Sequence, residues 1–272
     1  MSIMDKIRTK KEVLIMGIVN VTPDSFSDGG VFAEREDAVS HGLELEQQGA
    51  DIIDIGGEST RPGAAEVLLE EEISRTIPVI KSIREKTDVA ISIDTYKSEV
   101  AKQALDAGAN LINDISALRF DPKLGNVAAK NEVPIVLMHM QGTPQTMQKN
   151  PKYEDIISDI IAFFKERINV ATKSGIDAEN IIVDPGIGFG KRTEHNYETL
   201  RRLNEFHVLN KPILLGTSRK SFIGDILDLP ATERLEGTIA SNVVGILKGA
   251  NILRVHDVQE VYRATQVAIR CK

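Results

Sequence analysis

The sequence predicts an α/β protein that folds as a single (β/α)8 barrel, the TIM barrel. Short β-branched and apolar runs alternate with longer amphipathic stretches along the whole chain, and there are eight of each. The 272 residues divide into eight units of about 34 residues, the size of one βα unit. The sequence Gly-Ala-Asp or Gly-Ala-Asn recurs at 49–51, 108–110 and 249–251, which indicates equivalent turns between a helix and the next strand.

The eight strand candidates are mostly continuous apolar runs rather than alternating ones. This pattern is typical of parallel strands that are buried on both faces. In chain order they cover residues 13–19, 51–55, 89–94, 110–113, 134–138, 180–184, 212–216 and 251–255.

Eight helix candidates separate the strands. The clearest covers residues 153–173, where apolar side chains repeat at intervals of three and four. The others cover residues 35–48, 67–86, 97–107, 124–131, 194–206, 231–248 and 258–270. Glycines follow several of these helices, as is common at a helix C-terminus: Gly49, Gly108, Gly175 and Gly249.

We expect one domain over residues 1–272, because no linker, composition break or low-complexity segment divides the chain. A doubly wound open sheet is the alternative. It fits less well, since eight units are many for an open sheet.

Composition narrows the class of protein. With 33 basic and 40 acidic side chains the formal charge is -7, which argues against broad nucleic-acid binding. No apolar stretch approaches the roughly 18 residues of a membrane span, and residues 1–12 are too polar for a signal peptide. The lone Cys271 excludes an internal disulfide and a cysteine zinc site. We therefore expect a cytoplasmic protein without a membrane or nucleic-acid partner.

Polar residues gather where the predicted strands end, which is the active-site rim of this fold. A single carboxylate there is often only a helix cap. Carboxylates, amides and cations at all eight strand ends are hard to explain by capping alone. In strand order the residues are Asn20, Glu58, Thr60, Arg61, Asp94, Asn113, Asp114, His139, Asp184, Arg219, Lys220, Ser221, Arg254 and His256.

A glycine-rich run, Gly-Ile-Gly-Phe-Gly-Lys at 186–191, follows the sixth strand. It is one residue too short for a Walker loop, and Lys191 stands where a dinucleotide fingerprint needs glycine. We interpret it as a flexible loop around the apolar side chain of Phe189.

Two other features of the rim suggest function. The loop after the first strand has about 15 residues, longer than most βα connections, which favours a lid. Arg219, Lys220, Arg254 and His256 follow the last two strands, where barrel enzymes often bind phosphate. Ser221 is expected near a helix N-terminus, which favours an anion. Surface salt bridging is the alternative for some of these cations, above all Arg219.

Two of the strand-end segments are long and distinctive: Gly-Ile-Val-Asn-Val-Thr-Pro-Asp-Ser-Phe-Ser-Asp-Gly-Gly at 17–30, and Asp-Ile-Gly-Gly-Glu-Ser-Thr-Arg-Pro-Gly at 54–63. Shorter ones lie at 92–95, 112–114, 138–142, 184–191, 218–221 and 254–257. Together these segments resemble the dihydropteroate synthase family over nearly the whole chain. One departure is Ala117, where the family pattern has glycine. We expect little effect there, because Ala117 lies beyond the pocket-facing Asn113.

The resemblance implies a transferase of folate biosynthesis. In the reaction of this family, the amine of p-aminobenzoate displaces pyrophosphate from 6-hydroxymethyl-7,8-dihydropterin pyrophosphate and gives 7,8-dihydropteroate. The resemblance also implies Mg²⁺ as the cofactor, a dissociative displacement, mobile loops over the p-aminobenzoate site, and a homodimer. The apolar residues 239–247 could form the dimer contact, but packing within the barrel's own outer layer is the better default for them.

The resemblance also implies roles for individual residues. The expected pterin contacts are Asp94, Asn113, Met138, Asp184, Lys220 and Arg254, of which Asp94, Asp184, Lys220 and Arg254 are the candidate catalytic residues. The expected pyrophosphate contacts are Asn20, Arg254 and His256, with Asn20 also at the Mg²⁺. The expected p-aminobenzoate contacts are Phe26, Thr60, Arg61, Pro62, Phe189 and Ser221. The chemistry is suitable, because a carboxylate accepts from two donors of a pterin edge and a guanidinium stacks on a ring.

Two other functions stay open. A pterin-binding methyltransferase-type barrel shares the Asp and Asn pterin contacts, but it is expected to lack the Ser-Arg-Lys-Ser segment at 218–221 and the long first loop. A catalytically inactive pterin- or phosphate-binding barrel is disfavoured by the full set of strand-end groups.

Overall fold

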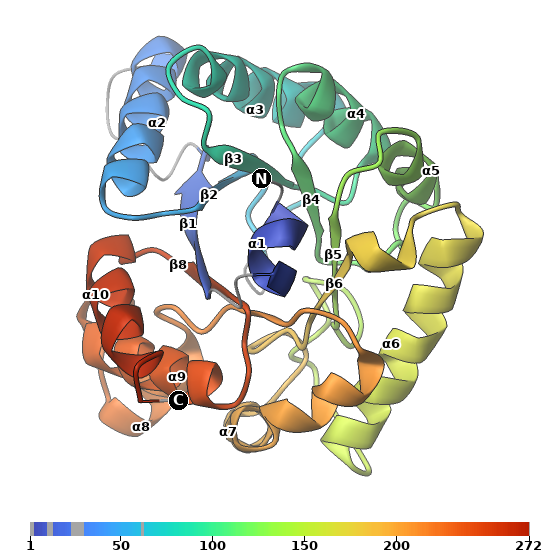
Figure 1. Cartoon of the computed structure of the whole chain (residues 1–272), viewed down its shortest axis with the longest axis vertical. Helices are drawn as coiled ribbons and strands as arrows, with labels where there is room; N and C mark the ends of the chain where they lie inside the picture. The colour runs from blue at the N-terminus through green and yellow to red at the C-terminus, as the bar shows by residue number, and fades with distance from the viewer. Residues whose placement is uncertain (1–2, 10–12, 23–29, 61–62, 272) are drawn as a thin grey trace.

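The computed structural model describes residues 3–9, 13–22, 30–60 and 63–271. Eight parallel strands form one sheet in the order β6-β5-β4-β3-β2-β1-β8-β7. Figure 1 shows them as a ring with the later helices around it and the N-terminal helix over its centre. The two edges of the sheet meet in a parallel bridge between Val183 and Ile213, and the N–H of Val183 donates to the carbonyl of Pro212 over 2.9 Å. The predicted (β/α)8 barrel is confirmed.

Each strand lies within two residues of its predicted range. The strands are β1 (Leu14–Asn20), β2 (Ile52–Gly56), β3 (Ala90–Asp94), β4 (Leu111–Asp114), β5 (Ile135–Met138), β6 (Ile181–Asp184), β7 (Leu214–Leu215) and β8 (Ile252–Val255).

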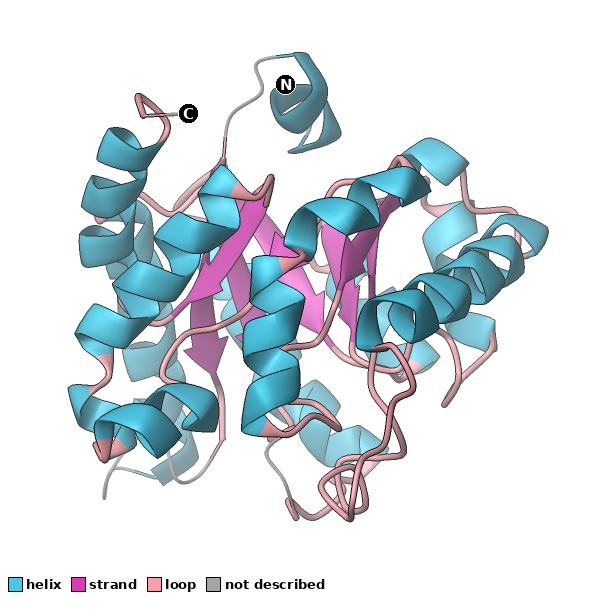
Figure 2. Ribbon diagram, turned by 90° about the horizontal axis from the view of Figure 1, so that it is seen from below, coloured by secondary structure: helices cyan, strands magenta, loops and turns pink. Residues whose placement is uncertain are grey.

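The helices surround the strands, as Figure 2 shows from the side. They are α1 (Ile3–Thr9), α2 (Gly30–Gln47), α3 (Leu69–Arg84), α4 (Ser98–Asp106), α5 (Lys123–Lys130), α6 (Ile156–Lys173), α7 (Thr193–Arg201), α8 (Ser221–Leu227), α9 (Leu235–Leu247) and α10 (Val258–Ala268), with short 3-10 helices η1 (Ala178–Asn180), η2 (Leu203–Leu209) and η3 (Ala231–Glu233). Among the described helices, none is both long and apolar enough to cross a lipid bilayer.

The structure divides two of the predicted helices. The helix expected at 194–206 is α7 followed by η2, and the one expected at 231–248 is η3 followed by α9. Helix α8 was not among the predicted helices, because its seven residues are too few to show a helical repeat. Asp228, the residue after α8, ends the helix with a left-handed φ of 53°.

Residues two apart on each strand face the barrel interior, and their character changes along the strand. The layer nearest the strand starts is apolar and contains Leu14, Met16, Ile52, Leu111, Val136, Ile182, Leu214 and Ile252. Two residues further along, the same faces carry Asp54, Asn113, Met138, Asp184 and Arg254. The strand register aligns Asp54 with Ser92, Asp94 with Asn113, and Met138 with Asp184. The polar rim is therefore the layer of the barrel core that lies nearest the C-terminal ends of the strands.

Helix α1 closes the N-terminal end of the barrel, although the first residues of the sequence look merely polar. Ile3, Met4 and Ile7 are buried against the apolar layer of the strands. Figure 2 shows α1 beyond the N-terminal ends of the strands. The side chain of Lys6 lies 3.4 Å from Asp51, which ties the helix to the start of β2. The missed signal is three apolar residues on one face of a short, charged helix.

Ala117 occupies a turn that favours glycine. Its φ is 50°, and that of Leu118 is 63°. The carboxylate of Asp114 holds the turn, because it accepts from the N–H groups of Ser116 over 2.7 Å and of Leu118 over 2.6 Å. A left-handed backbone costs a residue with a Cβ about 1–2 kcal/mol. Alanine in place of glycine at residue 117 therefore increases the backbone strain of this turn.

Candidate active site

The guanidinium of Arg254 lies at the centre of the rim between two carboxylates. Its Nε donates to Oδ2 of Asp54 over 2.6 Å, and its Nη2 donates to Oδ2 of Asp94 over 2.7 Å. Burial acts to lower the pKa of Arg254, but the two carboxylates outweigh it and hold the pKa above its usual value. The three residues come from β8, β2 and β3, so the barrel itself fixes their arrangement.

Asp54 is a site residue that the sequence analysis missed. It is fully buried, and its Oδ2 also accepts from Nδ2 of Asn113 over 3.2 Å. Its Oδ1 has no hydrogen-bond partner among the described residues. The available signal was a carboxylate inside an otherwise apolar strand, on the same face as Ile52. A buried carboxylate with a free oxygen is suited to accept from a ligand.

Asp94 has an unusual proton affinity. Burial raises its pKa to about 7, and Asp54 adds to the rise, while Arg254 opposes it. The strand end places its carboxylate directly at the mouth of the barrel interior. Asp94 can therefore exchange a proton near neutral pH.

Asp184 and Lys220 are a second set of opposite charges at the rim, and each affects the pKa of the other. Burial raises the pKa of Asp184, while Lys220 acts to lower it. Burial lowers the pKa of Lys220 to about 8, although Asp184 acts in the opposite direction. One oxygen of Asp184 accepts from the N–H of Gly186 over 2.7 Å. No side chain or N–H of the described residues donates to its other oxygen, which can therefore accept from a ligand.

The floor beside these charges is apolar. Met138 is buried with Ile115 and Met140, and Phe189 packs against this cluster. The Nζ of Lys220 lies 4.8 Å from the centre of the Phe189 ring. A flat ligand that has polar edges and apolar faces fits such surroundings.

The remaining predicted residues lie around this centre. Asn20, at the end of β1, is half-buried, and so is Thr60 after β2. His256 lies beside Ser218, with Nδ1 2.9 Å from the hydroxyl oxygen, and Ser221 is the exposed first residue of α8. Arg219 instead donates to Asp257 over 3.0 Å, which is the salt bridge expected as its alternative. Phe26, Arg61 and Pro62 lie outside the described residues.

The expectation of a flexible loop around Phe189 is wrong. The carbonyls of residues 186–190 each accept a hydrogen bond from a side chain. The donors, in order along the loop, are Lys191, Lys220, Gln148, Lys191 and Tyr153. The glycines here supply positive φ, for example 67° at Gly186, rather than mobility.

A cluster of charges anchors the segment after β2, and the sequence pattern gave no signal for it. The Nζ of Lys97 lies 2.6 Å from both Glu58 and Glu72. The hydroxyl of Tyr96 donates to Glu58 over 3.0 Å. Glu58 directly precedes Ser59 and Thr60, so this cluster fixes where the chain leaves the end of β2.

The described side chains of the rim offer few ligands to a metal ion. Among the described residues, no group of three or more His, Cys, Asp or Glu side chains could hold a metal. Asn20 supplies one neutral oxygen at the rim. Such a site fits an ion that takes most of its ligands from substrate phosphates and water.

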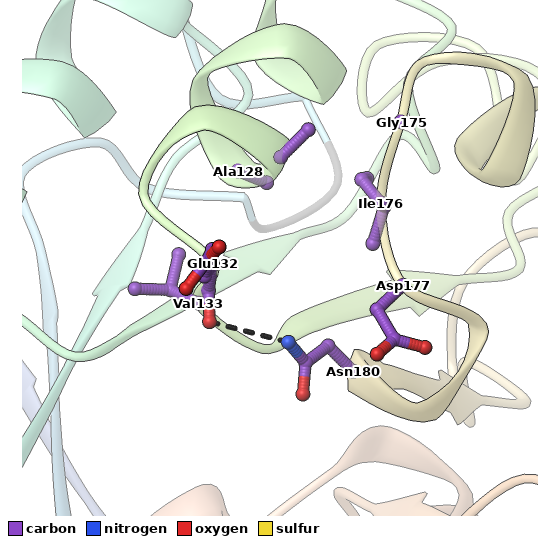
Figure 3. Close-up of a pocket in the computed structure, with 8 residues that line it drawn as sticks. Ala128, Glu132, Val133, Gly175, Ile176, Asp177 and Asn180 are labelled. Carbon is purple, nitrogen blue, oxygen red and sulfur yellow. Dashed lines mark hydrogen bonds between the residues drawn. The ribbon is translucent and has the colours of Figure 1, made fainter.

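A separate hollow of about 370 Å³ lies at the opposite end of the barrel, before β5 and β6 (Figure 3). The residues around it are Ala128, Ala129, Glu132, Val133, Gly175, Ile176, Asp177 and Asn180. The amide of Asn180 donates to the carbonyl of Glu132 over 3.2 Å across it. None of the rim's ionisable side chains with shifted pKa values lines this hollow, so the rim is the better candidate site.

The fold and the rim together define an enzyme of the barrel class, with a buried polar pocket for a flat ligand and cations beside it. The family described as "Pterin binding enzyme" matches residues 16–256. The chain belongs to the pterin-binding enzyme family, among the dihydropteroate synthases.

Similar proteins carry that name over nearly their whole length. The dihydropteroate synthase of Escherichia coli K12 is 50% identical over 253 residues, which cover 93% of this chain and 89% of the relative. That of Clostridium beijerinckii is 54% identical over 254 residues, which cover 93% and 92%. A crystal structure of the Yersinia pestis enzyme with a sulfonamide drug complex matches with a TM-score of 0.91 and 44% identity, over 96% of this chain and 94% of that one.

Proposed function

We propose that this chain condenses 6-hydroxymethyl-7,8-dihydropterin pyrophosphate with p-aminobenzoate and releases 7,8-dihydropteroate and pyrophosphate. The observation that carries the proposal is the buried layer in which Asp184, Asn113 and Lys220 adjoin the Arg254 guanidinium. Similar enzymes support it: the Xanthomonas albilineans dihydropteroate synthase, 42% identical, has a structure in complex with 7,8-dihydropteroate.

The pterin would lie flat on Met138 with its polar edge toward Asp184. A carboxylate accepts from the amino group and the ring N–H at once, which no single amide or hydroxyl does. Asn113 adds an amide on the same side, and Lys220 donates to the ring carbonyl. Asp94 and Asp54 would hold the ring from the opposite wall, where Asp54 has a free oxygen.

The pyrophosphate would leave toward Asn20, Arg254 and His256. Breaking the C–O bond sends its electron pair onto the pyrophosphate, so stabilising that growing charge is the main catalytic task. Bound Mg²⁺ would supply further charge neutralisation through the phosphate oxygens, with Asn20 as the protein's contribution. The methylene carbon becomes cationic as the bond breaks, and the electron-rich pterin spreads that charge.

The arylamine needs no activating base, because it is neutral and nucleophilic near pH 7. Its nitrogen forms the new bond to the methylene carbon and loses a proton to solvent. Catalysis at this subsite is therefore positioning. Phe189, Thr60 and Ser221 would line it, together with Phe26, Arg61 and Pro62 from the loops after β1 and β2, which we propose close over the substrate.

The proposal is tested by product analysis. The purified chain is incubated with both substrates and Mg²⁺, and the products are identified by mass spectrometry. We expect 7,8-dihydropteroate and pyrophosphate in equal amounts. Methyl transfer to or from a pterin instead would favour the methyltransferase-type barrel, and tight pterin binding without turnover would indicate an inactive homologue.

We also propose that the chain forms a homodimer through α9. Val244 and Leu247 on this helix are exposed, as are Ile226 and Leu227 on the adjacent α8. Exposed apolar side chains in one area are typical of an interface. Sedimentation of wild type and Val244→Asp would test this: we expect a dimer that the variant splits, and a wild-type monomer would contradict the proposal.

A further inference from the structure

Lys191 is a buried lysine that the proposed reaction does not use. It follows the glycine-rich loop and is almost fully buried. Its Nζ lies 2.9 Å from the carbonyl oxygen of Gly186, 3.1 Å from that of Phe189, and 2.9 Å from Nδ1 of His139. An ammonium has three donors, and here each one has a partner. Burial lowers the pKa of Lys191 well below its usual value, while Asp184 acts in the opposite direction. A buried amine is costly unless its donors have partners, as they do here.

His139 completes the arrangement from the end of β5. Burial lowers the pKa of His139 well below its usual value, and the charges of Lys191 and Arg119 act in the same direction. A neutral imidazole leaves Nδ1 free to accept from the lysine. The ring also packs edge-on against Phe163, with centres 4.9 Å apart, so its orientation is fixed. Whichever of the two groups carries the proton between them, the amine of Lys191 still donates to both carbonyls.

The backbone of the loop fixes one of its five carbonyls, because the N–H of Phe189 donates to the carbonyl of Gly186 over 3.0 Å, and the other four depend on side-chain donors. Gly186, Gly188 and Gly190 have φ values of 67°, 84° and 61°, and glycine reaches many other conformations in an unconstrained chain. The loop also passes very close to β5: a Cβ on Gly186 would lie 2.0 Å from the carbonyl oxygen of His139. Lys191 bonds the first and fourth of the five loop carbonyls, and so it spans the turn that presents Phe189.

The geometry points to Lys191 as a positioning residue for the arylamine subsite. We infer that its ammonium, with His139 as the third partner, sets where the Phe189 ring stands beside Lys220, and so sets the affinity for p-aminobenzoate more than for the pterin. This inference rests on the proposed function. Asp184, Asn113 and Met138 are placed by their own strands, so the pterin contacts depend on the loop less, although Lys191 also acts to lower the pKa of Asp184.

The first test compares Lys191→Met with Lys173→Met, which removes an exposed lysine from α6. Methionine has a similar length without donors. We expect Lys191→Met to raise the KM for p-aminobenzoate by about tenfold, with kcat and the pterin KM changed by less than about threefold. Lys173→Met should match wild type. Equal increases in both KM values, or no increase in either, would overturn the inference.

A second measurement does not depend on turnover. Hydrogen exchange of the amides in residues 186–190 should be faster in Lys191→Met than in wild type, with the strands unchanged. Unchanged exchange would show that Lys191 does not hold the loop, even if the wild-type chain proves inactive and the proposed function fails.

A further variant covers the case in which Lys191→Met does not fold. His139→Phe keeps the aromatic packing and removes the Nδ1 acceptor, so Lys191 keeps only its two carbonyl partners. We expect the same selective increase in the p-aminobenzoate KM, smaller than about tenfold. A wild-type KM together with wild-type exchange in this variant would overturn the role of the Lys191–His139 contact.

Discussion

The Nε of Arg254 on β8 donates to Oδ2 of Asp54 on β2 across the barrel interior, over 2.6 Å. The contact joins residues 200 positions apart in the chain. Together with Asp94 it holds the guanidinium in one place before any substrate binds. Preorganised charge of this kind is what stabilises a leaving group during reaction.

Asp54→Asn tests whether this contact matters for catalysis. The amide keeps the volume but removes the charge that fixes Arg254, and a small misplacement of a catalytic group costs about 100-fold in rate. We expect kcat/KM to fall between about tenfold and 100-fold with the fold retained by circular dichroism. Asp106→Asn, which changes an exposed pair with Lys102, is the matched control and should match wild type. Wild-type activity in Asp54→Asn would show that Arg254 does not depend on Asp54.

The raised pKa of Asp94 predicts that the free energy of unfolding depends on pH. Its pKa rises from 3.8 to about 7 on folding, so the folded state binds this proton more tightly than the unfolded state. The contribution of Asp94 to the free energy of unfolding is therefore present below about pH 4 and is lost as the pH rises to about 7. Urea denaturation of wild type and Asp94→Asn should show a wild-type advantage that shrinks with rising pH. A difference that stays constant or grows would contradict the raised pKa.

Asp184→Asn tests the pterin pocket. In the variant, an NH2 group replaces one acceptor oxygen of the carboxylate. The side chain therefore loses one charged hydrogen bond to the ligand, and its NH2 group lies opposite a ligand N–H that also donates. We expect the Kd for the pterin pyrophosphate, measured by calorimetry, to rise between about tenfold and 100-fold. Asp177→Asn, at the opposite end of the barrel, is the control. Unchanged affinity in Asp184→Asn would remove Asp184 from the pterin site.

Ala117→Gly tests the strained turn after β4. Glycine relieves the left-handed backbone, which offsets the loss of one buried methyl group. Ala101→Gly, equally buried in α4, loses the methyl group and also helix propensity. By chemical denaturation we expect Ala117→Gly to be at least about 1 kcal/mol more stable than Ala101→Gly. Equal losses in the two variants would mean that the turn stores no strain.

Much of the rim could be predicted because the fold has simple rules. Parallel strands deliver their C-terminal residues to one end of a barrel, so Asp94, Asn113 and Asp184 were found from the position of each in its strand. Arg254 was found the same way. That these side chains meet at one rim could be predicted without knowing where the helices lie.

The rest depended on contacts across the barrel that sequence spacing does not encode. Asp54 lies inside a strand, so only its inward direction, not its position at a strand end, marks it as functional. Lys191 and Lys97 are buried by partners from distant elements. The glycine-rich sequence after β6 suggested mobility, but side chains from two other segments, the β5–α6 connection and the end of the β7–α8 connection, bond its carbonyls.

Release of pyrophosphate is the most direct test of the proposed reaction. It is measured for wild type and Arg254→Ala, with each substrate alone, with both together, and with and without saturating Mg²⁺. We predict rapid release by wild type when the pterin pyrophosphate, p-aminobenzoate and Mg²⁺ are all present, and severely reduced release by Arg254→Ala. An unimpaired Arg254→Ala, or no release by wild type with both substrates and Mg²⁺, would contradict the proposed mechanism.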